Sequence, residues 1–163
     1  MQEFIADAQK RPGALRIGTP GLLNVTDLNL HGLERAANVK FTLTPFSGGG
    51  GEVIQNLLGG HVPMGFSQIQ TGLPHIRDNK LMPIATTGAT RWRQLPEVPT
   101  LVELGLKDMV TTTWFGMMVR SATPPDILAK IVSAAKRAHA DRNVKEKLEQ
   151  AGFDVPATAD AEF

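Results

Sequence analysis

The chain has 163 residues, of which 42% are hydrophobic and 20% charged, a size and composition typical of one globular domain or two small lobes. Its formal net charge of +1 argues against a nucleic-acid-binding protein, which usually carries a basic face. No apolar run approaches the roughly 18 residues that span a bilayer, so we expect a soluble chain. The absence of cysteine excludes disulfides and cysteine-bound zinc.

The first half of the chain alternates strand-like runs with helical patterns. Asn24 or Thr26 is a suitable N-cap for the second helix. The expected elements, in chain order, are a helix over 3–10, a strand over 15–18, a helix to about 37, a strand over 39–46, a glycine-rich turn, a helix over 52–58, a strand over 62–66, a helical turn over 73–79 and a strand over 81–86. This alternation predicts a parallel α/β sheet with right-handed crossovers.

The second half begins with a proline-marked loop and continues mainly with helices. Residues 101–104 suggest a short helix closed by Gly105, and residues 109–118 a strand. Thr123 as N-cap and Pro124 at the first position open a long helix to about residue 140. Its expected buried face consists of Ile127, Leu128, Ile131, Ala134, Ala135 and Ala138. A charged, solvated helix over 143–151 follows, and residues 160–163 resemble the first turn of another.

The glycine-rich turn over 47–52 is the most informative functional feature. Glycine lets backbone amides approach a ligand closely, and amides at the start of a helix favour an anion. A phosphate or carboxylate site is therefore the first hypothesis, with a plain tight connection as the alternative. No Gly-Lys-Ser/Thr follows the turn, and no G-x-G-x-x-G precedes a suitably placed acidic residue, so Walker and dinucleotide-binding loops are excluded.

Four strand ends carry small or polar residues, at 18–19, 46–48, 66–68 and 86–88. Open α/β sheets bind ligands at the carboxyl ends of their strands, so these segments are expected to converge on one crevice. None of the Thr, Ser, Gln and Gly residues there is a useful general acid or base. No G-x-S-x-G elbow activates Ser47 or Ser67, so we do not expect an enzyme.

The histidines, the Trp-Phe pair and two arginines could in principle bind a metal or a ligand, but we expect them to have structural or surface roles. The histidines are His31, His61, His75 and His139. No pair of them has metal-ligand spacing with an acidic partner, so neither a metal nor a cofactor is expected. Trp114 and Phe115 are interpreted as core packing rather than a ligand wall. Arg91 and Arg93 are interpreted as surface-loop residues rather than grips for a second carboxylate.

Three ordered stretches carry a family resemblance. The first is Pro-Phe-Ser-Gly-Gly-Gly with Leu-Leu-Gly-Gly-His-Val in 45–62, the second is 73–81, and the third runs from 86 to 125 with Leu-Pro-Glu-Val-Pro-Thr, Trp-Phe-Gly and Thr-Pro-Pro. Together they resemble the Bug-type extracytoplasmic solute-binding proteins of tripartite tricarboxylate transporters. The resemblance implies a two-lobed periplasmic protein that binds a small carboxylate, either a dicarboxylic acid or an amino acid. Such proteins pass the ligand to membrane transporter subunits and catalyse nothing.

The fold implied is α/β: a periplasmic-binding-protein type II-like lobe with a parallel-rich sheet flanked by helices. Residues 1–115 would form this second, ligand-binding lobe, and 116–163 an incomplete returning segment of the first lobe. Family members are longer and begin with an export signal, whereas this chain starts without a signal peptide. The chain is therefore interpreted as truncated at both ends, and a periplasmic location is implied by the resemblance alone.

The resemblance also implies a set of ligand-binding residues. They are Thr19, Leu23, Asn24, Ser47, Gly48, Gly49, Gly50, Ser67 and Gln68. Ser47 stands where the family commonly has lysine, Ser67 where aspartate is frequent, and Leu23 where a glycine is usual. Backbone amides, rather than a salt bridge, are thus expected to hold the ligand, and Leu23 either blocks close approach or forms an apolar wall.

Two alternatives from other functional classes remain open. One is a small α/β enzyme acting on an anionic substrate. The other is a truncated fragment that has lost ligand binding and self-associates as a homo-oligomer through exposed lobe surface. Nucleic acid is not an expected partner in any of these interpretations.

Overall fold

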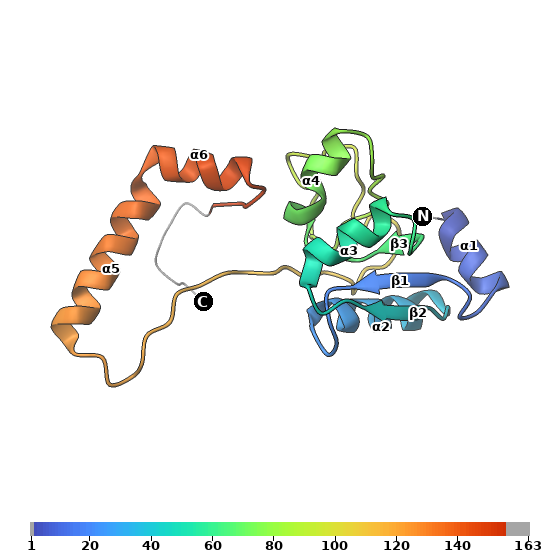
Figure 1. Ribbon diagram of the computed structural model, residues 1–163, viewed down its shortest axis with the longest axis horizontal. Coiled ribbons are helices and arrows are strands. Elements are labelled where there is room, and N and C mark those ends of the chain that lie inside the picture. The colour runs from blue at the N-terminus through green and yellow to red at the C-terminus, as the bar shows by residue number, and fades with distance from the viewer. Residues whose placement is uncertain (1, 156–163) are drawn as a thin grey trace. The chain divides into compact units, whose positions relative to one another are not determined.

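The computed structural model describes residues 2–155, so the helical turn expected over 160–163 lies outside the described part. The chain divides into two compact units, Met1–Thr112 (unit 1) and Thr113–Phe163 (unit 2), coloured from blue to yellow and from yellow to red in Figure 1. This division falls close to the boundary expected after residue 115. The assignment of the two units to lobes of a larger protein stays a prediction.

Unit 1 is built on three parallel strands in the order β2-β1-β3 (Figure 1). Strand β1 (Arg16–Thr19) lies in the centre, between β2 (Thr42–Pro45) and β3 (Met64–Gly65). Ile17 pairs with a residue of each neighbour, which fixes the register of both ladders. The predicted parallel α/β sheet is confirmed, with shorter strands than expected.

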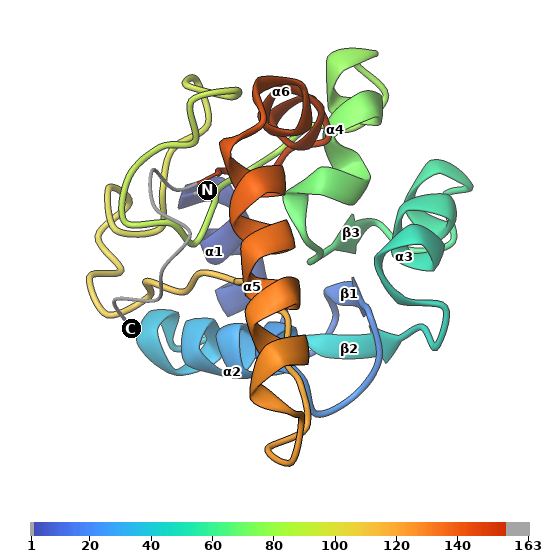
Figure 2. The same cartoon turned by 90° about the vertical axis from the view of Figure 1, so that its left-hand side faces the viewer.

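Helices cover both faces of this sheet. Unit 1 contains α1 (Gln2–Lys10), α2 (Val25–Ala37), α3 (Gly49–Leu58) and α4 (Ile69–Arg77). The crossover from β1 to β2 and the crossover from β2 to β3 run in opposite directions across the sheet. Right-handed connections then require α2 and α3 to lie on opposite faces, as Figure 2 shows.

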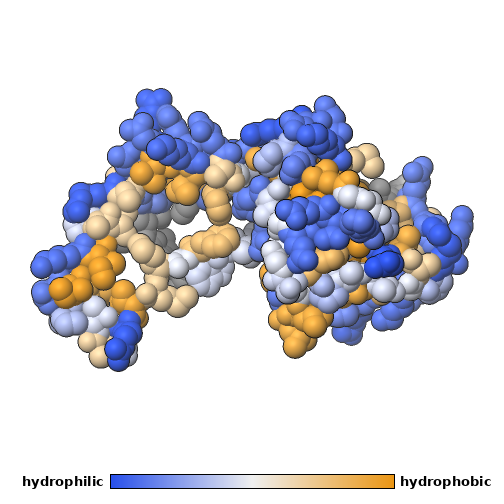
Figure 3. All heavy atoms as spheres, viewed as in Figure 1, coloured by the Kyte–Doolittle hydropathy of each residue, from blue (hydrophilic) through white to orange (hydrophobic). Residues whose placement is uncertain are grey.

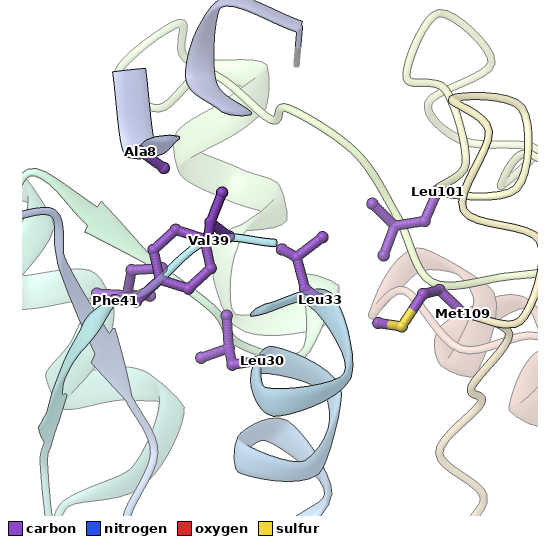
Figure 4. Packing of buried hydrophobic residues seen from close by; sticks show 8 residues of the cluster. Ala8, Leu30, Leu33, Val39, Phe41, Leu101 and Met109 are labelled. Atoms are coloured by element: carbon purple, nitrogen blue, oxygen red, sulfur yellow. The ribbon is translucent and has the colours of Figure 1, made fainter. Parts of the chain in front are cut away.

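The main hydrophobic core lies between the sheet, α1 and α2 (Figure 4). Its buried members are Ala8, Ile17, Leu30, Leu33, Val39, Phe41, Leu101 and Met109. Phe4 of α1 stacks on Phe41 with ring centroids 5.5 Å apart, which fastens the first helix to the sheet. Leu101 and Met109 show that the irregular segment after residue 95 completes this core.

A fourth strand over 81–86 was expected, and that prediction is wrong. The segment makes one isolated parallel bridge, between Thr86 and Thr100. Pro83 has no N–H to donate, and the N–H of Leu81 donates instead to the carbonyl of His75 at 3.2 Å. The segment therefore pairs with the later loop instead of extending the three-stranded sheet.

Two further elements of the second half also differ from expectation. Residues 101–104 form hydrogen-bonded turns rather than a helix, and residues 109–118 contain no strand. Thr100 and Glu103 cap this turn reciprocally: the Thr100 N–H donates to Glu103 Oε2 at 2.8 Å, and the Glu103 N–H donates to Thr100 Oγ1 at 3.2 Å. Within residues 109–118, which were expected to form a strand, the N–H of Thr111 donates to the carbonyl of Thr87 at 2.8 Å.

Between residues 113 and 155, unit 2 contains two helices, α5 (Pro125–Ala140) and α6 (Arg142–Gln150). The N-cap of α5 is Pro124, one residue later than predicted. Asp141 ends α5 and caps α6, since its Oδ1 accepts the Asn143 N–H at 2.8 Å. The buried face predicted for α5 is wrong, because neither helix has a buried residue among those described. No helix in the described part is both long and apolar enough to cross a membrane.

The prediction that Trp114 and Phe115 pack into a core is also wrong for the described residues. Both side chains are exposed. The ring of Phe115 makes an edge-to-face contact with the ring of Phe153, with centroids 5.5 Å apart.

Glu34 of α2 is a buried carboxylate that ties the end of its helix to the start of β2. Its Oε1 accepts the N–H of Phe41 at 2.8 Å, and its Oε2 lies 2.9 Å from His31 Nδ1 and 3.6 Å from Lys40 Nζ. Burial acts to raise the pKa of Glu34. The Phe41 amide, His31 and Lys40 outweigh burial and hold its pKa below the ordinary value.

This contact predicts an acid-labile contribution to stability. Because the folded state lowers the pKa of Glu34, its stabilisation is complete above the unfolded pKa and is lost as the pH falls towards the folded pKa. Glu34→Gln should lower the free energy of unfolding by about 1–2 kcal/mol at pH 7, with a smaller loss near pH 3. Urea unfolding at both pH values measures this. The exposed-site variant Glu97→Gln is the control, and an equal loss at both pH values would contradict the mechanism.

Candidate functional site

The loop between β1 and α2 is held by its own side chains. Thr19 is fully buried, and its Oγ1 donates to the carbonyl of Gly21 at 3.1 Å. Asn24 is the N-cap of α2: its Oδ1 accepts the N–H of Thr26 at 2.8 Å and that of Asp27 at 3.3 Å. The side-chain amide of Asn24 donates back to the loop backbone at 3.0 Å. Both predicted ligand-binding side chains thus also build the loop, and their contact with a ligand stays a prediction.

Leu23 occupies a strained position in this loop. Its φ of 54° lies in the left-handed region, which costs a branched residue about 1–2 kcal/mol. Its N–H donates to Oδ2 of the buried Asp27 at 2.5 Å, so its amide is occupied. The Leu23 side chain is 99% exposed, beside the exposed Leu22 and Leu28. Figure 3 shows an orange projection at the lower edge of unit 1, where Figure 1 places this loop.

The glycine-rich turn belongs to the first turn of α3, which begins three residues before the expected start at Glu52. Gly48 is the N-cap, and Gly49 has a positive φ of 73°. The Gly48 N–H donates to Glu52 Oε2 at 2.7 Å. A carboxylate therefore already binds one amide of the predicted anion site, and it belongs to the protein itself. Ser47 is exposed at the tip of the turn.

The end of β3 brings two hydroxyl groups to the same place. Ser67 Oγ lies 3.1 Å from Thr71 Oγ1, which donates to the carbonyl of Gln68 at 2.7 Å. A Cβ added to Gly50 would lie 2.6 Å from Ser67 Oγ and 3.2 Å from Thr71. The N-terminus of α3 and this hydroxyl pair are thus in direct contact. Predicted residues Gly50, Ser67 and Gln68 are brought together.

The fourth predicted strand end does not join the sheet edge. Thr87 Oγ1 donates to the carbonyl of Thr111 at 2.8 Å, and Thr111 Oγ1 contacts Asn29 Oδ1 of α2 at 2.5 Å. Thr86 Oγ1 is buried and has no hydrogen-bond partner among the described atoms. The sheet edge is therefore formed by the ends of β1, β2 and β3.

The charged side chains at this edge are acidic. The segments 18–24, 45–52, 66–71 and 86–88 contain Glu52 but no lysine or arginine. Arg91 pairs with Glu103 at 2.9 Å and donates to the carbonyl of Pro96 at 2.9 Å, which confirms its place in a surface loop. The Thr100 amide and Arg91 hold the pKa of Glu103 below its ordinary value. Amides and hydroxyls are the donors that this edge offers to a ligand.

A metal site finds no support among residues 2–155. No group of three or more histidine, aspartate or glutamate side chains in that range is placed to hold a metal ion. A hollow of about 740 Å³ lies beside the C-terminal end of α2, with His31, Glu34 and Lys40 in its lining. It contains none of the predicted ligand-binding residues.

Three residues that shape the site escaped the sequence interpretation, namely Asp27, Thr71 and Glu52. Each contacts a predicted site residue four positions earlier, respectively Leu23, Ser67 and Gly48. The signal that could have found them is this repeated i, i+4 spacing of a polar side chain at the start of a helix.

Comparison with known proteins is consistent with this geometry. A model of the tripartite tricarboxylate transporter family receptor matches residues 1–162. A Cupriavidus necator protein described as a UPF0065 protein in the gbd 5' region is 37% identical over 155 residues, covering 95% of this chain and 46% of that protein.

Solved structures agree with the fold. One described as a periplasmic transporter aligns with a TM-score of 0.88 at 25% identity, over 97% of this chain and 52% of its own. MatC from Rhodopseudomonas palustris, solved with bound malate, aligns with a TM-score of 0.83 at 28% identity, over 96% of this chain and 53% of its own. The chain thus spans about half the length of these proteins, and the predicted fold class is confirmed.

Proposed function

This chain belongs to the tripartite tricarboxylate transporter receptor family, and we propose that unit 1 binds a small carboxylate for delivery to a membrane transporter. The ligand would be a dicarboxylic acid or an amino acid, and malate bound to MatC supports this class. The proposal includes a periplasmic location and no catalysis, because the matched family consists of transport receptors.

The observation that carries the proposal is the meeting of the α3 N-terminus with Ser67 and Thr71 at the edge of the parallel sheet. The amides of Gly50 and Gly51 lie in the first turn of α3, where amides have no partner within the helix. A carboxylate there can accept from amides, hydroxyls and bridging water without a lysine or arginine. Each such bond to a charged acceptor contributes about 1.5–3 kcal/mol, which suits reversible capture.

Calorimetric titration of the full chain with malate, adipate, aspartate and glutamate tests the proposal. Binding of at least one acid with an affinity between about micromolar and millimolar, with the acid recovered unchanged, is the expected result. Proton NMR of the titrated acid monitors its integrity. Conversion of the acid would support the enzyme alternative, and silence across the panel would refute carboxylate binding by this chain.

A second candidate, self-association, is favoured by the surface of unit 2. Helices α5 and α6 have no buried residue among those described, and the segment before them exposes Trp114, Phe115, Met117 and Met118. Exposed apolar patches of this kind commonly mark interaction surfaces. A dimer by light scattering, together with silence in the titrations, would favour this alternative.

A further inference from the structure

One of the protein's own carboxylates binds the N-terminus of α3, which is part of the proposed site. Glu52 is half-buried, and its Oε2 accepts the Gly48 N–H at 2.7 Å. A Cβ on residue 48 would lie 2.8 Å from that oxygen, so a larger residue there would have to displace the Glu52 carboxylate. A ligand carboxylate that binds the next amides of the turn must therefore share the N-terminus of α3 with an existing negative charge.

A second carboxylate lies under the adjoining loop. Asp27 is only 6% exposed, and its Oδ2 accepts the Leu23 N–H while its Oδ1 is buried without a partner among the described atoms. No lysine or arginine occurs in the four segments that were expected to form the crevice. Among these segments and the first turn of α3, Glu52 is thus the charged side chain that a ligand meets.

Resting on the proposed function, we propose that Glu52 selects ligands by charge, favouring a carboxylate that also carries an ammonium group over a purely anionic dicarboxylate. The ammonium group pairs with Glu52, while the ligand carboxylate accepts from the Gly50 amide and the Ser67 hydroxyl, because the Thr71 hydroxyl already donates to the carbonyl of Gln68. A dicarboxylate without an ammonium group meets repulsion from Glu52. Like charges about 4 Å apart change an affinity about fivefold in water, and more strongly at a partly buried site.

Aspartate and malate are a matched pair of probes, because an ammonium group in one replaces a hydroxyl in the other. Both are titrated into the full chain, into Glu52→Gln and into the control Glu97→Gln, which removes an exposed charge elsewhere. Glu52→Gln should weaken aspartate and tighten malate, so that the ratio of their affinities falls at least about fivefold. Glu97→Gln should leave the ratio unchanged. Glu52→Ala, as a second variant, should repeat the change.

Other outcomes overturn the selection by Glu52. If Glu52→Gln tightens both acids equally, Glu52 only competes for the Gly48 amide. If neither affinity changes, Glu52 only caps α3. Either result leaves the proposed function standing, whereas failure of every acid to bind the unaltered chain refutes the proposed function and the selection with it.

A ligand-free measurement tests the contact on its own. In an NMR titration of the full chain, the Gly48 amide resonance should shift as the Glu52 carboxylate is protonated, and this shift should vanish in Glu52→Gln. If the Gly48 amide resonance does not shift when this carboxylate is protonated, the proposal is overturned, irrespective of the ligand affinities.

Discussion

Leu30→Ala is expected to lower the free energy of unfolding of unit 1 by about 3 kcal/mol. Leu30 is 1% exposed and lies between α2 and the sheet, in the cluster with Ile17 and Phe41. Truncation removes its burial and leaves a cavity that the surrounding side chains fill only in part, since the cluster also includes long-range contacts from Leu101. Chemical unfolding followed by circular dichroism measures the loss.

The matched control is Leu28→Ala, two residues earlier on the same helix. Leu28 is 73% exposed, so its truncation tests the change in helix propensity without a cavity. We expect a loss below about 0.5 kcal/mol. Equal losses at the two positions would mean that α2 does not pack on the sheet through the face described here.

The parts of the fold that were predictable from sequence are those governed by local chemistry. Asn24 caps α2 as expected, because its side chain reaches two amides of the first turn whatever lies farther away. The alternation of apolar runs and helical patterns likewise predicted the parallel sheet. At α5, Thr123 was expected as N-cap and Pro124 as the first helical residue, and the helix starts one residue later, with Pro124 at the N-cap.

The wrong predictions concern residues whose partners lie far away in sequence. The segments 81–86 and 109–118 have strand-like composition, yet Thr86 bridges Thr100 and Thr111 bonds to Thr87 instead. Composition reports β propensity but not which strand edge is available. The apolar face of α5 is real in sequence, but the described residues supply nothing that buries it.

The site itself was predictable only in outline. Glycines after an apolar run indicated amides at the start of a helix, and the structure places Gly48 at the N-cap of α3 and Gly49 and Gly50 in its first turn. The contact between Glu52 and the Gly48 amide depends on the rotamer of the Glu52 side chain. The pattern of glycines in the turn does not specify that rotamer. The role of these glycines toward a ligand stays a prediction, and the two neighbours Gly50 and Gly51 offer a direct test.

Gly50→Ala is expected to weaken carboxylate binding at least about tenfold. Its Cβ would lie 2.6 Å from Ser67 Oγ, so the hydroxyl pair must move away from the N-terminus of α3. Loss of one bond to a charged acceptor, at about 1.5–3 kcal/mol, corresponds to roughly a ten- to hundredfold change in affinity. Calorimetry with whichever acid binds the unaltered chain measures it.

Gly51→Ala is the matched control for Gly50→Ala, because it adds the same methyl group at a position where that group meets no neighbour. A Cβ on Gly51 meets nothing within 4 Å, and its backbone φ is not among the positive ones. Alanine there should stabilise α3 by up to about 1 kcal/mol and leave ligand affinity unchanged. Thermal unfolding of the two variants gives a readout without ligand, in which Gly50→Ala should melt below Gly51→Ala because only the former displaces Ser67. If both variants bind and melt alike, the contact between α3 and the end of β3 is not part of the site.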